Sequence, residues 1–122
     1  MLTIEEVVEL YEKEGLVIIF KQINKKFGPK TLAGEYNTEN NLNNSTKPPE
    51  IIIYQKMIEN QKDLEITLLH EFIHARNDLI LELDKENDTE VEKEAVETYK
   101  KSPEVIEFIK DFYCLKKLNF NP

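Results

Sequence analysis

The sequence predicts an α+β fold in which a small three-stranded twisted sheet packs on a helix that carries both histidines of the chain. An N-terminal helix, a glutamate-rich helix and a C-terminal helix complete the expected fold. Apolar residues recur at helical spacing in three segments, and short β-branched apolar runs lie between the first two of them. The 122 residues are enough for one hydrophobic core, so we expect residues 1–122 to form a single domain.

The N-terminal segment is expected to form a helix over residues 4–14, followed by a strand. Thr3 lies three residues before Glu6, which is the pattern of a capping box, and Gly15 is typical of a helix C-terminus. The β-branched apolar run at residues 16–20 is too short for an independent helix. It therefore predicts a buried strand.

Two further strands are expected before the helix that carries the histidines. Residues 31–36 predict a weaker strand, with Gly34 as the site of a bulge. Residues 37–49 are rich in Asn, Ser, Thr and Pro, so they predict an exposed loop. Residues 50–55 predict the third strand, which could bind an extended peptide through main-chain hydrogen bonds if it lies at an edge of the sheet.

Two helices are expected in the segment with the histidines and the glutamates. Asp63 is expected to cap the first of them, and a linker follows it over residues 79–88. Thr89 and Glu92 repeat the capping-box pattern, so they predict a second helix over residues 89–101.

The last helix is expected to begin at Ser102 and Pro103, because serine suits the N-cap and proline suits the first helical turn. Apolar residues continue beyond this helix at Leu115, Leu118 and Phe120. This apolar tail could pack on the chain itself or on a second copy, so a homo-oligomer formed through the C-terminal segment is one expected partner.

The composition excludes several classes of partner. The formal net charge of −8 provides no basic surface for a phosphate backbone, so we expect no nucleic-acid partner. No apolar run approaches the roughly 18 residues of a membrane span, and the acidic, amphipathic N-terminus does not resemble a signal peptide. Cys114 is the one cysteine, so an internal disulfide is excluded. These features predict a cytoplasmic protein without a membrane partner.

The two histidines are four residues apart, in the sequence His70-Glu71-Phe72-Ile73-His74. Positions i and i+4 lie on one face of a helix, so both imidazoles could bind a single Zn²⁺, with Glu71 beside the same ion. A carboxylate that lies next to a catalytic zinc without binding it can act as a general base. The motif therefore predicts a zinc hydrolase with His70 and His74 as metal ligands and Glu71 as the catalytic base.

A catalytic zinc needs three protein ligands and one open position, so a third ligand is expected downstream. Glu90, Glu94 and Glu97 share one face of the glutamate-rich helix, whereas Glu92 points elsewhere and is expected to face solvent. Ala95 is small and would let two helices approach closely enough for a neighbouring carboxylate to reach the metal. We therefore predict Glu94 as the third ligand, with Glu90 as the second choice.

The segment His70–Asp78 resembles the active-site helix of the gluzincin metallopeptidases, the thermolysin-like group. The likeness includes the alanine directly after His74 and the aspartate four residues after it. Glu94-Ala95 resembles the Glu-Ala pair of the glutamate helix in that group, at a matching distance from His74. The likeness covers residues 63–101, and in size and order of motifs the chain is similar to the minigluzincins.

The resemblance implies a minimal catalytic domain that binds one Zn²⁺ through His70, His74 and Glu94. It implies that Glu71 is the base of peptide hydrolysis. It also implies that Asp78 orients His74 through a hydrogen bond.

Two functions remain open from the sequence. The first is a zinc-dependent endopeptidase that acts on a peptide or protein and is autoinhibited, as in those minigluzincins that resemble zymogens. The alternative is an inactive or latent metal-binding domain that holds a partner protein. The presence of Glu71 favours the first, whereas Thr98 stands where the family often has an aspartate that orients a histidine. The residue that stabilises the oxyanion is left open among Tyr54, Tyr99, Tyr113 and Arg76.

Overall fold

The computed structural model describes residues 1–22, 25–27, 30–38 and 47–115. Its elements are α1 (Ile4–Glu12), β1 (Val17–Lys21), β2 (Lys25–Phe27), β3 (Lys30–Leu32), β4 (Gly34–Asn37), β5 (Glu50–Tyr54), the 3₁₀ turn η1 (Gln55–Met57), α2 (Gln61–Leu79), α3 (Asp88–Lys101) and α4 (Pro103–Phe112). Four helices and a three-stranded mixed sheet confirm the predicted α+β fold class.

The three-stranded sheet has the order β1-β5-β4, with β1 parallel and β4 antiparallel to β5. The strand expected over residues 50–55 is confirmed as β5, but β5 lies between two neighbours, so the condition for peptide binding at its edge is not met, and β4 lies at an edge instead. The weaker strand expected over residues 31–36 is divided at Ala33 into β3 and β4, and β3 pairs with β2 in a separate two-stranded sheet.

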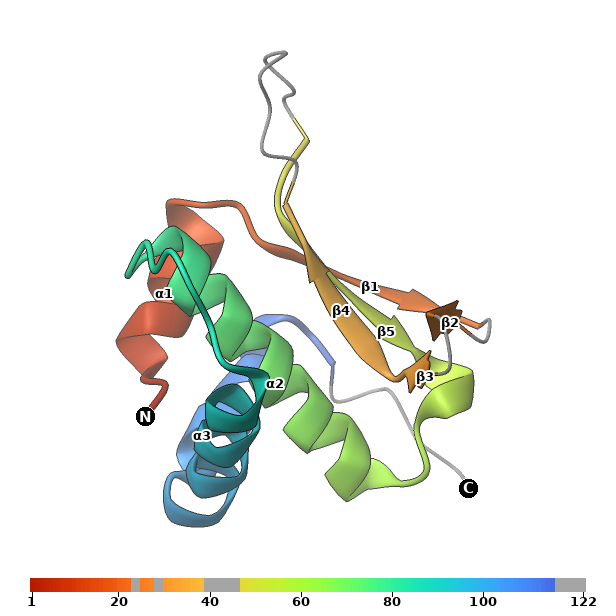
Figure 1. Ribbon diagram of the computed structural model, residues 1–122. Coiled ribbons are helices and arrows are strands. Elements are labelled where there is room, and N and C mark those ends of the chain that lie inside the picture. Colours follow the sequence, from red (N-terminus) through yellow and green to blue (C-terminus); the bar gives the residue numbers. More distant parts are fainter. Residues whose placement is uncertain (23–24, 28–29, 39–46, 116–122) are drawn as a thin grey trace.

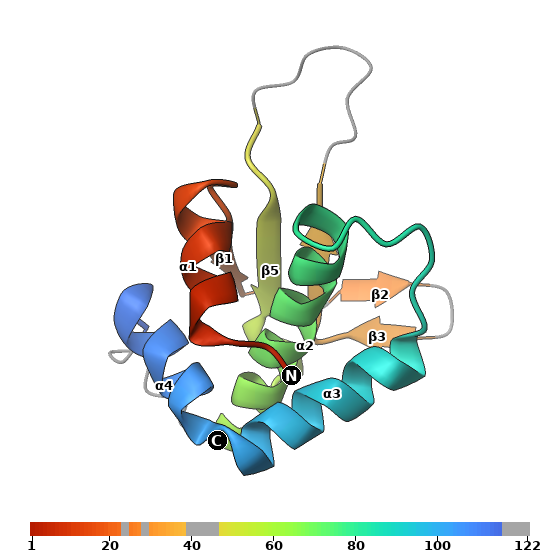
Figure 2. The ribbon, with the colours of Figure 1, turned by 90° about the vertical axis from the view of Figure 1, so that its left-hand side faces the viewer.

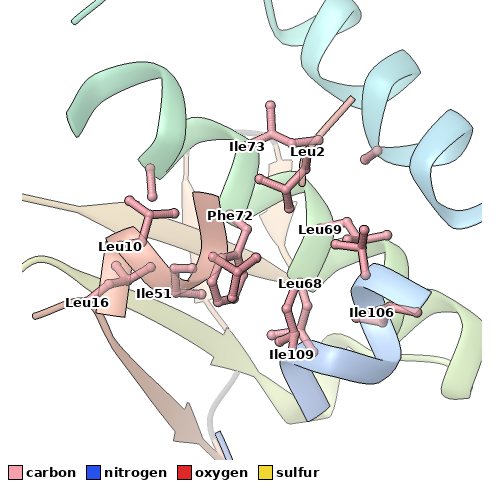
Figure 3. Close-up of a cluster of buried hydrophobic side chains, with 14 of the residues drawn as sticks. Leu2, Leu10, Leu16, Ile51, Leu68, Leu69, Phe72, Ile73, Ile106 and Ile109 are labelled. Atoms are coloured by element: carbon pink, nitrogen blue, oxygen red, sulfur yellow. The ribbon is translucent and has the colours of Figure 1, made fainter. Parts of the chain in front are cut away.

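Helix α2 lies between the sheet and the other helices (Figures 1 and 2). On one side it contacts β4 and β5, and on the other it contacts α1 and α3. Its apolar residues fill the core between these layers, where Phe72 has 0% of its surface exposed and lies among residues from α1, β5 and α4 (Figure 3). Every element that surrounds the histidines is thus held by packing on α2.

Gly34 allows β4 to lie close to α2. A Cβ atom at this position would lie 2.9 Å from Cγ2 of Thr67 and 3.3 Å from the backbone oxygen of Ile52. Such distances are shorter than ordinary van der Waals contact, so only glycine fits without a shift of the strand. Gly34 therefore belongs to a close strand-helix contact instead of the bulge that the sequence predicted.

The helix starts differ in part from the expected ones. The capping box of Thr3 and Glu6 is confirmed, and Pro103 occupies the first turn of α4. Helix α2 begins earlier than predicted, because Asn60 is its N-cap and accepts a hydrogen bond from the backbone N–H of Asp63. Asp63 itself accepts from the backbone N–H of Glu59 at 3.0 Å, so its side chain caps the turn that precedes the helix.

The start of α3 is also shifted, and this shift affects the site. Asn87 is the N-cap, and its side chain accepts from the backbone N–H of Thr89 at 2.9 Å. The predicted capping box of Thr89 and Glu92 is therefore wrong. Because the helix begins at Asp88, that carboxylate lies in the first turn, and the side chain of Glu92 is available for another partner.

In the part of the chain that the structure describes, no helix is both long and apolar enough to cross a membrane. Of the three apolar tail residues expected to support self-association, Leu115 packs against the core cluster. Leu118 and Phe120 lie outside the described residues.

Candidate metal centre and cleft

His70 and His74 lie on one face of α2, as predicted, with their Nε2 atoms 3.1 Å apart. The Nδ1 atom of each ring lies 2.8 Å from a carboxylate oxygen, that of Glu92 for His70 and that of Glu86 for His74. A carboxylate thus binds Nδ1 of each ring, while the Nε2 atoms of the two rings point toward each other.

This arrangement assigns the tautomer of His70. A carboxylate accepts hydrogen bonds, so the neutral ring of His70 carries its proton on Nδ1, toward Glu92, and presents an unprotonated Nε2. Burial lowers the pKa of His70 from its ordinary value, and the adjacent His74 lowers it further, so the neutral form is favoured. Nε2 of His74 lies within hydrogen-bond distance of Nε2 of His70, at 3.1 Å, and of Oδ1 of Asp88, at 3.2 Å, so one proton or one cation at this point would be shared by these groups.

Asp88 is the acidic residue that completes the group. Its Oδ1 lies 3.2 Å from Nε2 of His74, and the three donor atoms of His70, His74 and Asp88 lie within 4.8 Å of one another. In a tetrahedral zinc site with bonds of about 2.0–2.1 Å, neighbouring donor atoms are about 3.3 Å apart. Two of the observed separations are close to that spacing, so the donor set fits one zinc ion.

The structure does not bring Glu94 to the histidines. Its two carboxylate oxygens accept hydrogen bonds from Arg76, at 2.6 Å from Nη1 and 2.8 Å from Nη2. Burial raises the pKa of Glu94, but the hydrogen bonds and charge of Arg76 outweigh burial and hold that pKa below its usual value. Glu94 is therefore the partner of a buried guanidinium, and the predicted third ligand has to be corrected.

Helix geometry explains why Glu92, and not Glu94, contacts a histidine. Residues two apart on a helix are separated by about 200°, so Glu92 and Glu94 point to opposite sides of α3. Glu92 is exposed, as expected, and also contacts His70, whereas Glu94 faces Arg76 on the other side of the helix. Glu90, the second choice, is exposed and is not among the residues that line the cleft.

The contacts of Asp78 and Thr98 also differ from the expected ones. Asp78 accepts a hydrogen bond from the hydroxyl of Tyr36 at 2.8 Å, whereas Nδ1 of His74 is held by Glu86. Asp78 thus fixes β4 against α2 instead of orienting a histidine. Thr98 is fully buried and its hydroxyl donates to the backbone carbonyl of Glu94, so its side chain packs within the fold and binds its own helix.

Glu71 lies in the same cleft as the two histidines and is only 6% exposed. Burial raises the pKa of this carboxyl to about 7; the charge of His74 opposes the shift and the neighbouring acidic groups add to it. A carboxylate with a pKa close to neutral can accept a proton and release it again at neutral pH. The environment of Glu71 therefore suits the predicted general base.

The cleft has a volume of about 1260 Å³ and lies over the histidine face of α2, with β4 on one side and α3 on the other. None of the four expected oxyanion donors lines it. The hydroxyl of Tyr54 donates to Glu35, that of Tyr113 donates to the carbonyl of Leu16, and Arg76 is paired with Glu94. Tyr36 does line the cleft, so it is the tyrosine that a bound ligand could reach.

One feature of the sequence, Asn87, indicates that Asp88 lies in the first turn of α3. Asparagine is as strong an N-cap as threonine, so Asn87 was an equal candidate for the start of α3. With that start, Asp88 and Glu92 are one helical turn apart on the face toward α2. The antiparallel pairs His74 with Asp88 and His70 with Glu92 follow from this spacing.

Comparisons of the chain with models of known families, with curated proteins and with solved structures found no match.

The ligand assignment predicts different effects of two carboxylate substitutions on zinc affinity. Asp88→Ala removes one of the three converging donor groups. Loss of a residue that only hydrogen-bonds a metal ligand weakens zinc binding roughly 10- to 100-fold, and Asp88→Ala should weaken it by more than that. Glu94→Gln should leave zinc affinity within about twofold of the wild-type value, because Glu94 contacts Arg76. Competition with a fluorescent chelator measures both affinities. Loss of zinc from Glu94→Gln with retention by Asp88→Ala would restore the original assignment.

Proposed function

We propose that this protein is a zinc-dependent endopeptidase. The observation that carries the proposal is the convergence of Nε2 of His70, Nε2 of His74 and Oδ1 of Asp88 beside the buried carboxyl of Glu71, in an open cleft. Three protein ligands with a fourth position open to solvent are typical of catalytic zinc, whereas structural zinc sites are closed by four protein ligands. The side chain of Asp88 is 85% exposed, which supports an open position.

A zinc ion held by His70, His74 and Asp88 would polarise the carbonyl of a peptide bond and lower the pKa of water toward neutrality. Glu71 takes the proton from the attacking water and delivers it to the leaving amine, for which its raised pKa is suited. Glu86 and Glu92 bind Nδ1 of His74 and His70, so they hold the imidazoles in the orientation that directs both Nε2 atoms to the proposed ion.

The walls of the cleft support a peptide as the substrate. Strand β4 is an edge of its sheet in the described structure, and Gly34, Glu35 and Tyr36 of this strand line the cleft. An extended peptide can add to such an edge through main-chain hydrogen bonds, which requires no particular side chains. The opposite wall, α3, has 14 residues and is about 20 Å long, enough for about six extended residues. These dimensions favour cleavage within a chain.

The proposal is tested by incubating zinc-loaded protein with casein and with an unbiased peptide library, and by identifying products by mass spectrometry. We expect internal cleavages that stop when a chelator removes the metal and return when zinc is added back. His74→Ala, treated identically, serves as the control for a contaminating protease. If the zinc-loaded protein leaves all peptides intact, the alternative function, a metal-binding domain that holds a partner protein, replaces this one.

A further inference from the structure

One wall of the cleft is a single continuous face of α3. The residues that α3 contributes to the lining come in adjacent pairs that repeat every four positions: Asp88 and Thr89, Glu92 and Lys93, Val96 and Glu97, Lys100 and Lys101. Positions four apart lie on one side of a helix, so this face follows the cleft over the whole length of α3. Figure 2 shows α3 crossing beneath α2 and the strands from its beginning to its end.

The charge of this wall changes along its length. At its beginning, Asp88 and Glu92 contact the two histidines. At its end stand Lys100 and Lys101, both exposed to solvent. Lys93 is the cation of the acidic part, and half-buried Val96 and Glu97 lie between the two parts. A ligand that lies along α3 therefore meets a region of net negative charge beside the histidines, then Val96 with Glu97, and then two cations.

The basic end is unusual in a chain whose formal net charge is −8. The acidic side chains at the metal centre would repel a carboxylate placed close to them, and the lysines would attract one placed further along. Eight residues separate Glu92 from Lys100, which corresponds to about 12 Å along the helix. An extended peptide covers this distance with about three to four residues.

We propose that the cleft selects peptides with an acidic side chain about three to four residues from the cleaved bond, on the side bound toward Lys100 and Lys101. This inference rests on the proposed peptidase function and names the class of substrate.

The test uses fluorogenic peptides that are identical except for Glu, Gln or Lys at one position, placed in turn one to five residues from the cleaved bond on each side. We expect kcat/KM for the Glu peptide to exceed that for the Gln peptide about fivefold, on one side only, and three to four residues from the bond. This magnitude corresponds to one or two exposed ion pairs. The ratio should fall as salt is added, because exposed charges are screened.

Variants of the two lysines show whether they cause this preference. Lys100→Gln combined with Lys101→Gln should reduce the Glu to Gln ratio to about one, and Lys100→Glu with Lys101→Glu should favour the Lys peptide. The control, Lys13→Gln with Lys56→Gln, changes the net charge equally at positions that do not line the cleft and should keep the wild-type ratio. Equal cleavage of Glu and Gln peptides by the wild type, or a preference that persists without the lysines, overturns the inference.

The two proposals fail in different ways. If a neutral peptide is cleaved in a zinc-dependent reaction but acidic peptides gain nothing, the peptidase function stands and the substrate class is wrong. If no peptide is cleaved, the peptidase function is wrong, and binding of the same peptides to the zinc-loaded protein, measured by fluorescence anisotropy, still tests the selectivity. Equal affinities for Glu and Gln peptides would then overturn it.

Discussion

Glu71→Gln is expected to lower the rate of peptide hydrolysis about 10²- to 10⁴-fold, the usual contribution of a general base, while zinc remains bound. The amide has the shape of the carboxyl group but cannot take a proton from water. Because the amide fills the same buried space and Glu71 is not one of the converging donor groups, the substitution should leave both the fold and the metal site intact. Initial rates on one fluorogenic peptide, together with the zinc content of the same samples, measure both effects.

Glu90→Gln is the matched control for this experiment. Glu90 is an exposed carboxylate of α3 that does not line the cleft, so its substitution should change the rate by less than about twofold. If Glu71→Gln retains the wild-type rate, another group accepts the proton. If it loses zinc, Glu71 is a ligand, and the assigned roles of the cleft residues have to be exchanged.

Arg76→Met is expected to lower the free energy of unfolding by about 3 kcal/mol, near the lower end of the range for a broken buried ion pair. The side chain of Arg76 is 8% exposed and donates two hydrogen bonds to Glu94. Its removal leaves a carboxylate without its main partner, although the 24% exposure of Glu94 lets water compensate in part. Urea unfolding monitored by circular dichroism measures the change, and zinc affinity should stay close to that of the wild type.

The double variant Arg76→Met with Glu94→Leu distinguishes the cost of leaving Glu94 without its partner from the cost of the packing lost with the Arg76 side chain. It replaces both charged groups with apolar ones, so it should be more stable than Arg76→Met alone. If Arg76→Met is as stable as the wild type, the pair does not stabilise the fold.

The histidine pair could be predicted from the sequence because it depends on one local property, the periodicity of a single helix. His70 and His74 remain on the same face wherever α2 begins, so the shift of its N-cap to Asn60 had no effect on them. The capping box of Thr3 and Glu6 is equally local, and it is also confirmed.

The acidic residue that meets the two histidines was less predictable because it depends on how α3 is rotated against α2. Each residue turns a helix by about 100°, so the choice between Glu92 and Glu94 reverses the face that meets the histidines. The rotation is fixed by tertiary contacts: Val91 and Ala95 are buried in the core, and Arg76 reaches Glu94 from α2. A guanidinium buried against a carboxylate has no periodic pattern, so nothing in the sequence indicates that Glu94 pairs with Arg76.

The order of the strands in the sheet could not be predicted from local sequence patterns either. The apolar run of β5 predicts burial, which is confirmed by Ile51 and Ile53 at 0% exposure, but burial does not specify the neighbouring strands. The parallel pairing of β1 with β5 joins Val17 to Glu50, far apart in sequence. This long-range pairing puts β5 in the centre and leaves β4 at the edge beside the cleft.

The most direct test of the account is a calorimetric titration of metal-free protein with zinc. We predict that the wild-type chain binds one ion, and that His70→Ala and His74→Ala each lose this binding, because both Nε2 atoms contact the same point. A wild-type protein that takes up no zinc, or one that binds it equally well without either histidine, would contradict the proposed metal centre.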